Sequence, residues 1–215
     1  GGILGVNVPV AAAPAEVLCV PGLVVEAIAA PRFEPEALEL LTTKPKWKTN
    51  VRLVEVGVPG EARSAIEYRR IAGGMLVQQA DHLPDPEAEW KVVTQTSPTE
   101  TQLGDLRFAW SVVRHVKSNA IVVAKDAMLL GAGAGQMSRV DSVRIAVEKA
   151  GDRIPEAVVA SDAFFPFPDS IEVLANAGVR AVIQPGGSRN DDDVVAACDR
   201  HGLSMIFTGR RHFKH

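Results

Sequence analysis

From residue 120 to residue 208 the sequence alternates short apolar runs with amphipathic segments, and this alternation limits the possible fold more than any other feature. The apolar runs lie at residues 120–124, 128–131, 157–161, 180–184 and 203–208. The segments between the later runs have the 3.6-residue spacing of helices and lie at residues 138–150, 169–177 and 191–201. A strand hairpin followed by alternating helices and strands predicts an α/β protein whose sheet has helices on both faces.

The residues before 120 give weaker signals of the same kind. Strands are expected at residues 2–6, 23–30, 51–56 and 90–94, a short helix at 35–41, and a ribbon with a glycine pair at 69–79. A further helix should begin near residue 97, because Ser97 can cap it, Pro98 suits its first position and Glu100 completes a capping box.

The composition excludes several classes of protein. Hydrophobic residues make up 47% of the chain, which is enough for a sizeable core and argues against disorder. The formal net charge is -3, whereas nucleic-acid-binding proteins normally show a basic field, so no nucleic-acid partner is expected. No apolar run approaches the ~18 residues of a membrane span. The start of the chain lacks the basic segment of a signal peptide, so cytoplasm is the expected compartment.

Cys19 and Cys198 are the only two cysteines, and they are far apart in the sequence. Their spacing predicts neither a disulfide framework nor a metal site. The chain also begins without Met, which suggests a piece of something longer.

The stretch from residue 161 to residue 169 is the most unusual in composition. It holds three of the seven phenylalanines, and two prolines exclude an ordinary helix or central strand. It leaves the end of an apolar strand, which is where α/β proteins usually bind ligands. Two interpretations remain open, a ligand-binding wall and a hydrophobic plug over the sheet edge.

Glycines at alternate positions lead from the strand at 128–131 into the helix that starts with Arg139. Such a turn lets backbone amides approach an anion, and Arg139 adds a planar cation. The spacing of Gly131, Gly133 and Gly135 does not match the dinucleotide-binding fingerprint, so a tight turn remains the alternative. Asn119, just before a strand, can either terminate the preceding helix or point its carboxamide into a cleft.

Two further segments follow strands of the same predicted sheet. Residues 185–190 combine two glycines with Ser188 and Arg189, which suits either a carboxylate ligand or a polar turn before a helix. Residues 208–215 are basic, and a chain end that lies over this sheet edge would bring Arg211 and His215 near Phe164. The alternative is an ordinary frayed tail.

Together these segments resemble the carboxy-terminal part of the bifunctional family that joins aminoimidazole carboxamide ribonucleotide formyltransferase to IMP cyclohydrolase. The matching segments are Ser118-Asn119, residues 133–141, 161–167 and 184–188, Thr208-Gly209, Arg211-His212-Phe213 and His215. The first half resembles the same family at residues 1–3, 26–31 and 73–78. The resemblance includes order and spacing, and it covers essentially the whole chain.

The resemblance implies a cytidine-deaminase-like three-layer α/β/α sandwich. Residues 1–97 would be the remainder of a first formyltransferase subdomain with its connector, and residues 98–215 a complete second subdomain. The family is a homodimer with active sites at the subunit interface, so a second copy of the chain is an expected partner. The implied reaction moves a formyl group from 10-formyltetrahydrofolate to the amine of the aminoimidazole carboxamide ribonucleotide, in purine biosynthesis. A monovalent cation near Asp162 is a further candidate.

The family's binding residues can be carried over onto this sequence. The resemblance implies that the nucleotide contacts Gly1, Glu26, Asn119, Arg139, Phe164 and Arg211. It implies that the folate contacts Val140, Pro166, Phe167, Asp169, Ser188 and Arg189. Arginines suit the substrate phosphate, and an apolar and aromatic wall suits the flat pterin. Asn119 is the candidate catalytic residue in a supporting role, as a donor to the developing charge on the formyl oxygen.

The family's cyclohydrolase domain and a catalytic Lys-His pair come before the part that this chain resembles. The only Lys-His dipeptide here, Lys214-His215, matches the family's chain end instead. We therefore expect part of a longer enzyme that is inactive or nearly so alone. The alternatives are a standalone module that binds nucleotide or folate without catalysis, and an oxidoreductase suggested by the glycine turn alone.

Overall fold

The computed structural model describes residues 1–58, 66–81 and 84–214. The chain divides into two compact units, Gly1–Ala65 and Ile66–His215, and each is described by itself. Within the described residues, no helix is long and apolar enough to cross a bilayer.

The first unit is a small parallel sheet with a helical layer. Its strands are β1 (Gly2–Gly5), β2 (Val25–Ala30) and β3 (Arg52–Glu55), in the order β1-β2-β3. Its helices are α1 (Ala12–Leu18) and α2 (Pro35–Thr43). Ile28 of the central strand packs with Ala15 and Leu41 of the helices, so the core lies between the sheet and the helical layer.

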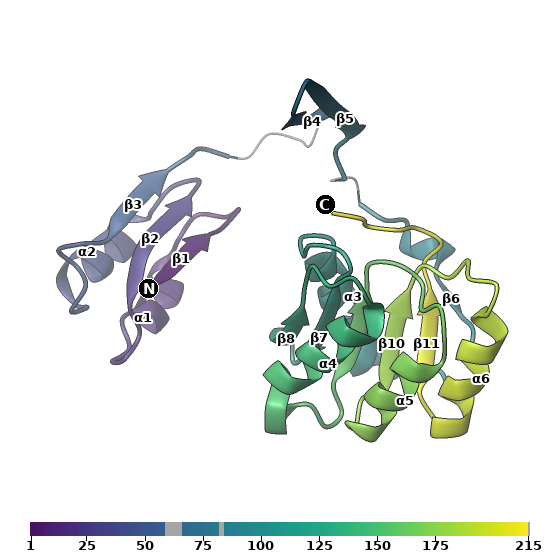
Figure 1. Ribbon diagram of the computed structural model, residues 1–215. Helices are drawn as coiled ribbons and strands as arrows, with labels where there is room; N and C mark the ends of the chain where they lie inside the picture. Colours follow the sequence, from purple (N-terminus) through teal and green to yellow (C-terminus); the bar gives the residue numbers. More distant parts are fainter. Residues whose placement is uncertain (59–65, 82–83, 215) are drawn as a thin grey trace. The chain divides into compact units, whose positions relative to one another are not determined.

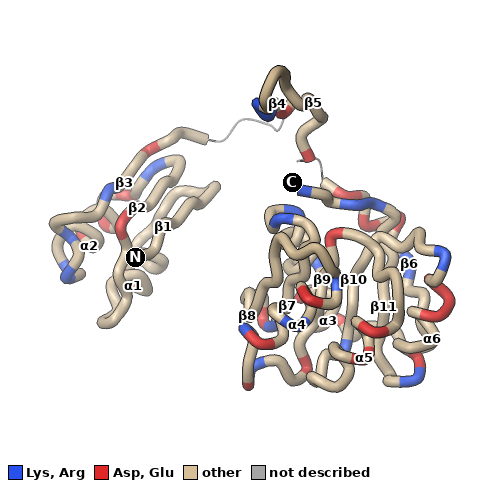
Figure 2. Tube along the Cα trace, viewed as in Figure 1, with Lys and Arg blue, Asp and Glu red and all other residues tan. Residues whose placement is uncertain are grey.

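The second unit contains a six-stranded mixed sheet in the order β6-β11-β10-β9-β7-β8 (Figure 1). Its strands are β6 (Lys91–Val92), β7 (Ile121–Lys125), β8 (Met128–Gly133), β9 (Val158–Ser161), β10 (Ala181–Gln184) and β11 (Ser204–Phe207). β9, β10 and β11 are parallel, whereas β7 runs antiparallel to both β8 and β9. These three parallel strands carry no charged residue and are tan throughout in Figure 2, as expected for strands buried on both faces.

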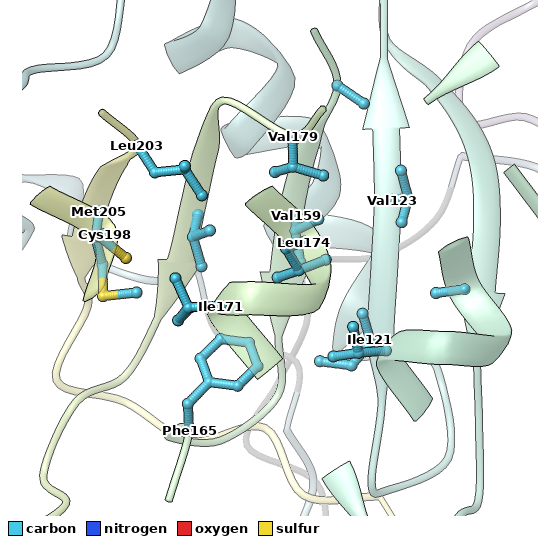
Figure 3. Close-up of a cluster of buried hydrophobic side chains, with 14 of the residues drawn as sticks. Ile121, Val123, Val159, Phe165, Ile171, Leu174, Val179, Cys198, Leu203 and Met205 are labelled. Carbon is cyan, nitrogen blue, oxygen red and sulfur yellow. The ribbon is translucent and has the colours of Figure 1, made fainter. Parts of the chain in front are cut away.

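Helices cover both faces of this sheet and make three layers. The helices are α3 (Glu100–Val113), α4 (Arg139–Ala150), α5 (Asp169–Asn176) and α6 (Asp191–His201), with a short 3₁₀ turn η2 at Gly151–Arg153. Leu106 and Trp110 of α3 pack on one face, against Val122 and Ile183. The other three helices cover the opposite face, where Phe165 joins their core (Figure 3). The α/β class and the helices on both faces are therefore confirmed for this unit.

The second unit also contains a two-stranded antiparallel hairpin, which is the expected ribbon. Its strands are β4 (Ile66–Ile71) and β5 (Gly74–Gln79), and a 3₁₀ turn η1 follows at Glu87–Glu89. Every residue of the two strands is exposed, including Tyr68 and Leu76.

Two details differ from the sequence-based expectation. Thr99, not Ser97, is the N-cap of α3, and Gln102, not Glu100, completes the capping box. The T-x-x-Q pattern of Thr99 and Gln102 lies two residues further along and has the same chemistry, so the helix begins two residues later than predicted.

The described residues between 66 and 97 group with the second compact unit. β6 pairs with β11, and Asp81 and Asp85 form hydrogen bonds with His212, so these residues belong to the second unit.

Candidate functional site

The segments singled out in the sequence meet at one edge of the six-stranded sheet. β9, β10 and β11 are parallel, so the residues that follow them share that edge. β7 runs the other way with Ile121 opposite Ser161, and therefore the residues that precede β7 reach the same edge. Gly133 at the end of β8 lies opposite Ile121 as well. This edge thus collects Asn119, the start of α4, the proline-rich stretch and the basic segment after β11.

A cavity of about 560 Å³ opens at this edge. Its lining includes eight of the twelve residues named for ligand contact: Asn119, Arg139, Val140, Phe164, Pro166, Phe167, Asp169 and Arg211. Met137, Ser138, Ala163, Ser170 and Phe213 complete the lining. The size is within the range of small-molecule sites.

One side of the cavity, called the buried wall below, is formed by Asn119 and Arg139. Behind it, Arg139 is hydrogen-bonded to Ser161 and Asp162, which are fully buried and do not line the cavity. Arg139 is only 8% exposed, and its Nη1 donates to Asp162 Oδ1 at 2.6 Å and to Ser161 Oγ at 2.8 Å. The second oxygen of Asp162 accepts from Ser118 Oγ at 2.5 Å. Arg139 is therefore first of all the counter-ion of a fully buried carboxylate, which reduces the charge it can offer to a ligand.

Asn119 completes the buried wall. Its Oδ1 accepts from Nη2 of Arg139 at 2.9 Å, and its Nδ2 donates to the carbonyl oxygens of Gln136 and Met137 at 2.9 and 3.2 Å. Two interpretations of Asn119 were left open, a helix end and a side chain at a cleft. The structure supports the second, because Asn119 lines the cavity and α3 ends earlier, at Val113. Its hydrogen bonds fix Arg139 and the loop before α4.

The alternate glycines before α4 have a packing role. Gly131 and Gly133 lie two residues apart in β8, so a Cβ at either position would be on the same face of the strand. A Cβ at Gly131 would collide with the carbonyl oxygen of Ala146, and a Cβ at Gly133 with that of Ser142. The glycines thus allow α4 to pack directly on β8, which explains their spacing and removes the basis for the oxidoreductase alternative.

The other side of the cavity is an exposed wall formed by Phe167, Arg211 and Phe213. The guanidinium carbon of Arg211 lies 5.0 Å from the centre of the Phe164 ring, so the expected proximity of these two residues is confirmed. Phe167 is 59% exposed and Phe213 is 43% exposed, far more than is usual for phenylalanine. Arg211 is also exposed, and no carboxylate among the described residues forms an ion pair with it. His215 lies outside the described residues.

The loop after β10 touches this site without lining it. Asn190 Nδ2 donates to the carbonyl oxygen of Pro166 at 2.8 Å, which ties the loop to the proline-rich stretch. The backbone N–H groups of Gly187 and Ser188 donate to Asp191 Oδ2 at 2.7 and 3.2 Å, so the protein's own carboxylate occupies this glycine turn. Ser188 and Arg189 are therefore not brought into the cavity.

Gly1 and Glu26 belong to the first unit. They are neighbours there, since the Gly1 nitrogen lies 3.9 Å from Glu26 Oε1, and a Cβ at Gly1 would collide with the Glu26 side chain. The Glu26 side chain is 62% exposed.

Phe213 and Ser170 are cavity residues that sequence reasoning missed. The signal for Phe213 was its position two residues after Arg211, which puts both on one side of an extended segment. Ser170 follows Asp169 at the start of α5, where its backbone N–H donates to Asp169 Oδ1 at 2.7 Å. In the part of the chain that the structure describes, no cluster of three His, Cys, Asp or Glu side chains could hold a metal ion.

The fold and the cavity define an α/β protein with a small-molecule type of site at the carboxyl ends of its parallel strands. The family model of the AICARFT/IMPCHase bienzyme matches residues 1–149, and the chain belongs to that family. It is 58% identical over 215 residues to the bifunctional purine biosynthesis protein PurH of Rhodopirellula baltica and 47% identical to that of Oceanobacillus iheyensis. Each comparison covers 100% of this chain and 41% of the relative, so the chain spans about two fifths of their length.

Among solved structures, RibD of Acinetobacter baumannii is similar with a TM-score of 0.34 and 19% identity, over 50% of this chain and 34% of that one. A likeness of this size does not bear on the fold.

Proposed function

We propose that this chain is part of an enzyme that transfers a formyl group from 10-formyltetrahydrofolate to the aminoimidazole carboxamide ribonucleotide during purine biosynthesis. The observation that supports this most directly is the cavity, which collects eight residues at which the resemblance implies ligand contact. Family membership adds support, because relatives named as bifunctional purine biosynthesis proteins match the whole chain.

The nucleotide is assigned to the part of the cavity beside Phe164 and Arg211. The Arg211 guanidinium is exposed and is the available cation for a phosphate, which it can bind through two parallel hydrogen bonds. Phe164 offers an aromatic face for the imidazole ring. Arg139 contributes through the donors that Asp162, Ser161 and Asn119 leave unused, so it orients the ligand more than it attracts charge.

The folate is assigned to Val140, Pro166, Phe167 and Asp169. Pro166 and Phe167 form an apolar and aromatic surface that suits a flat pterin. Asp169 stands at the first position of α5 and can accept hydrogen bonds from pterin N–H groups. Ser188 and Arg189 would reach the folate only beyond the cavity, at the loop that Asn190 ties to Pro166.

In the proposed reaction the nucleotide amine attacks the formyl carbon and forms a new N–C bond. The bond from that carbon to N10 of the folate breaks, and one amine proton is finally transferred to N10. The amine is conjugated with the imidazole carboxamide and is a poor nucleophile, so it needs a base and close placement. The cavity lining holds the Asp169 carboxylate, which is assigned to the folate, and the resemblance assigns proton transfer to a Lys-His pair that comes before the matching segments. We accordingly expect negligible turnover by this chain alone.

Asn119 keeps a supporting role in this proposal. Both of its amide hydrogens point to the carbonyl oxygens of Gln136 and Met137, so it would have to release one of them to reach a formyl oxygen. Its direct contact with Arg139 makes positioning the simpler contribution.

A monovalent cation near Asp162 is not needed for any of these steps. The oxygens of Ser118 and Asp162 are of the type that hard cations bind. Arg139 already balances the charge of Asp162, however, at 2.6 Å. Neutral oxygens would therefore have to hold the cation.

The remaining family properties complete the proposal. The six-stranded sheet and its helices would form a cytidine-deaminase-like subdomain at residues 98–215. Residues 1–97 would be the remainder of the first subdomain and the connector. A homodimer would supply the surfaces that cover exposed apolar residues such as Tyr68 and Leu76 of the hairpin. Gly1 and Glu26 would contact the nucleotide, and the compartment would be the cytoplasm.

Calorimetry on this chain tests the proposal. The aminoimidazole carboxamide ribonucleotide should bind, and the matching ribonucleoside, which lacks the phosphate, should bind on the order of tenfold or more weakly. A formyl-transfer assay on the same preparation should show negligible turnover. Equal affinity for both ligands would contradict the phosphate assignment, and binding of neither would contradict the proposed function of the cavity. Nucleotide binding that persists with no turnover in a longer natural chain would favour the binding-module alternative.

A further inference from the structure

His212 is a fully buried histidine in the extended segment that follows β11. Its neighbours Arg211 and Phe213 both line the cavity, whereas the His212 side chain lies among carboxylates. Successive side chains of an extended segment point in opposite directions, which explains this division. The backbone N–H of His212 donates to the carbonyl oxygen of Asp162 at 2.9 Å, so the segment runs directly beside the buried wall.

Both ring nitrogens of His212 lie within hydrogen-bond distance of a carboxylate. Nδ1 is 2.6 Å from Asp81 Oδ2, and Nε2 is 2.8 Å from Asp85 Oδ2. An ionised carboxylate can only accept hydrogen bonds, so each ring nitrogen must donate. This arrangement selects the imidazolium form of His212, because a neutral ring carries one N–H only.

The surroundings hold the two carboxylates in place. Trp110 Nε1 donates to the same Asp85 oxygen at 2.6 Å, and its ring centre lies 4.8 Å from that of His212. Arg114 lies 3.1 Å from Asp81 Oδ1, and Arg210 lies 3.1 Å from Asp85 Oδ1. Burial raises the pKa of the Asp81 carboxyl, but the hydrogen bond and charge of His212, with those of Arg114, outweigh it and hold that pKa below its usual value.

Two further basic groups face this cluster. Burial and the charges of Lys214 and Arg114 lower the pKa of His115, so His115 favours its neutral form. The Lys214 ammonium is directed to the carbonyl oxygen of His115 at 3.2 Å. The backbone of the segment is also fixed, because Ser118 N–H donates to the Lys214 carbonyl at 2.8 Å and Lys214 N–H donates to Ser118 Oγ at 3.0 Å.

We propose that His212 is a positioning residue: as an imidazolium held between Asp81 and Asp85, it fixes the segment after β11 so that Arg211 and Phe213 face the cavity. We call the contacts of His212 with Asp81 and Asp85 the His212 clamp. The expected effect on nucleotide affinity rests on the proposed function, whereas the existence of the clamp does not. The imidazole is fully buried and does not line the cavity, so it acts through the segment and through Arg211.

The charge on His212 can be tested in the unmodified protein. Two-bond ¹H–¹⁵N correlation spectra of the histidine rings distinguish an imidazolium from either neutral tautomer. At neutral pH the His212 ring should show two protonated nitrogens. A spectrum in which one ring nitrogen of His212 lacks a proton would overturn the proposal, whatever the protein binds.

A test of the positioning role requires a variant in which the side chain at position 212 keeps its size and polarity but loses the charge. His212→Gln should increase amide hydrogen exchange at position 212 and at Lys214 by on the order of tenfold or more, the scale for loss of a charged hydrogen bond. Exchange in the central strands β9 and β10 should stay unchanged. His201→Gln is the matched control, because His201 also contacts a carboxylate, Glu172 at 2.5 Å, but this pair is partly exposed and joins the end of α6 to α5.

Affinity for the aminoimidazole carboxamide ribonucleotide is the second measurement on the same variants. It should fall about tenfold in His212→Gln and stay unchanged in His201→Gln. Unchanged exchange together with unchanged affinity in His212→Gln would overturn the proposal. If the unmodified chain does not bind the nucleotide at all, the proposed function fails, and the ring spectra and the exchange rates still decide whether the clamp exists.

Discussion

The two walls of the cavity differ in how their charges are compensated. In the buried wall, Arg139 is 8% exposed and neutralised by Asp162, and Asn119 has no unused amide hydrogen. In the exposed wall, Arg211 has no carboxylate partner among the described residues, and two phenylalanine rings are open to solvent. The comparison teaches that two arginines of one site can have different tasks. Arg139 holds the site together, whereas Arg211 is available to a ligand.

The largest expected effect follows from removing the buried arginine. Arg139→Ala leaves Asp162 as an unpaired buried charge, which costs about 3–5 kcal/mol of unfolding free energy. Arg144→Ala is the matched control on the same helix, since its ion pair with Asp141 is exposed and contributes about 0–1 kcal/mol at most. Denaturant unfolding measures both, and a similar small loss in the two variants would show that the buried wall does not depend on Arg139.

The packing of α4 on β8, which places Arg139 at the cavity, should be sensitive to a larger side chain at Gly133. A methyl group at Gly133 meets the Ser142 carbonyl, so Gly133→Ala should destabilise the protein by about 1–3 kcal/mol through overpacking. Gly104→Ala, in an exposed and open part of α3, should instead stabilise by about 0.5–1 kcal/mol. Thermal unfolding compares the pair, and a neutral Gly133→Ala would mean that α4 can move away from β8 at little cost.

The exposed wall should respond in affinity and not in stability. Arg211→Ala should weaken binding of the aminoimidazole carboxamide ribonucleotide by about 1–3 kcal/mol, the scale of a hydrogen bond to a charged group. Its unfolding free energy should stay within about 0.5 kcal/mol of the unmodified protein. Arg189→Ala is the control, because Arg189 is exposed near the same edge but does not line the cavity. Equal losses of affinity in the two variants would contradict a specific role for Arg211.

The smallest expected effect is on the stability of the protein at acidic pH. The pKa of Asp81 is lowered in the folded protein, so its ionised form stabilises the fold above the ordinary value of 3.8 and that contribution disappears as the pH falls below it. Asp81→Asn should therefore flatten the acid limb of a stability-against-pH curve, while stability near neutral pH decreases slightly. If the acid limb is the same in both proteins, the contact between His212 and the Asp81 carboxylate does not contribute to stability.

Much of the second unit could be predicted because its signals are local. The apolar runs become β7 to β11, and the amphipathic segments become α4, α5 and α6 within one or two residues at their ends. Strand order and direction then bring Asn119, Phe164 and Arg211 to one edge, which position in the chain already suggested for parallel strands. Here the prediction needed only strand ends and the rule that ligands bind where parallel strands finish.

What the sequence could not supply were the partners of charged groups. Arg139 was expected to meet phosphate because a first-turn arginine suits an anion, but Asp162, 23 residues away, is its partner. The glycine turn at 186–188 suits a carboxylate ligand, but a carboxylate of the protein itself, Asp191, accepts its hydrogen bonds. His212 received no role, since Asp81 and Asp85 are 131 and 127 residues earlier in the chain. Such pairings depend on tertiary contacts that no local pattern encodes.

The pairing of residue 118 with residue 214 has a consequence for how the site forms. These hydrogen bonds join segments 96 residues apart, and the contacts of His212 span still more of the chain. Closing such long loops is slow and entropically costly, and chains are synthesised from the amino end. The sheet and the buried wall can therefore assemble before Arg211 and Phe213 arrive. During biosynthesis, the exposed wall should therefore form after the buried wall.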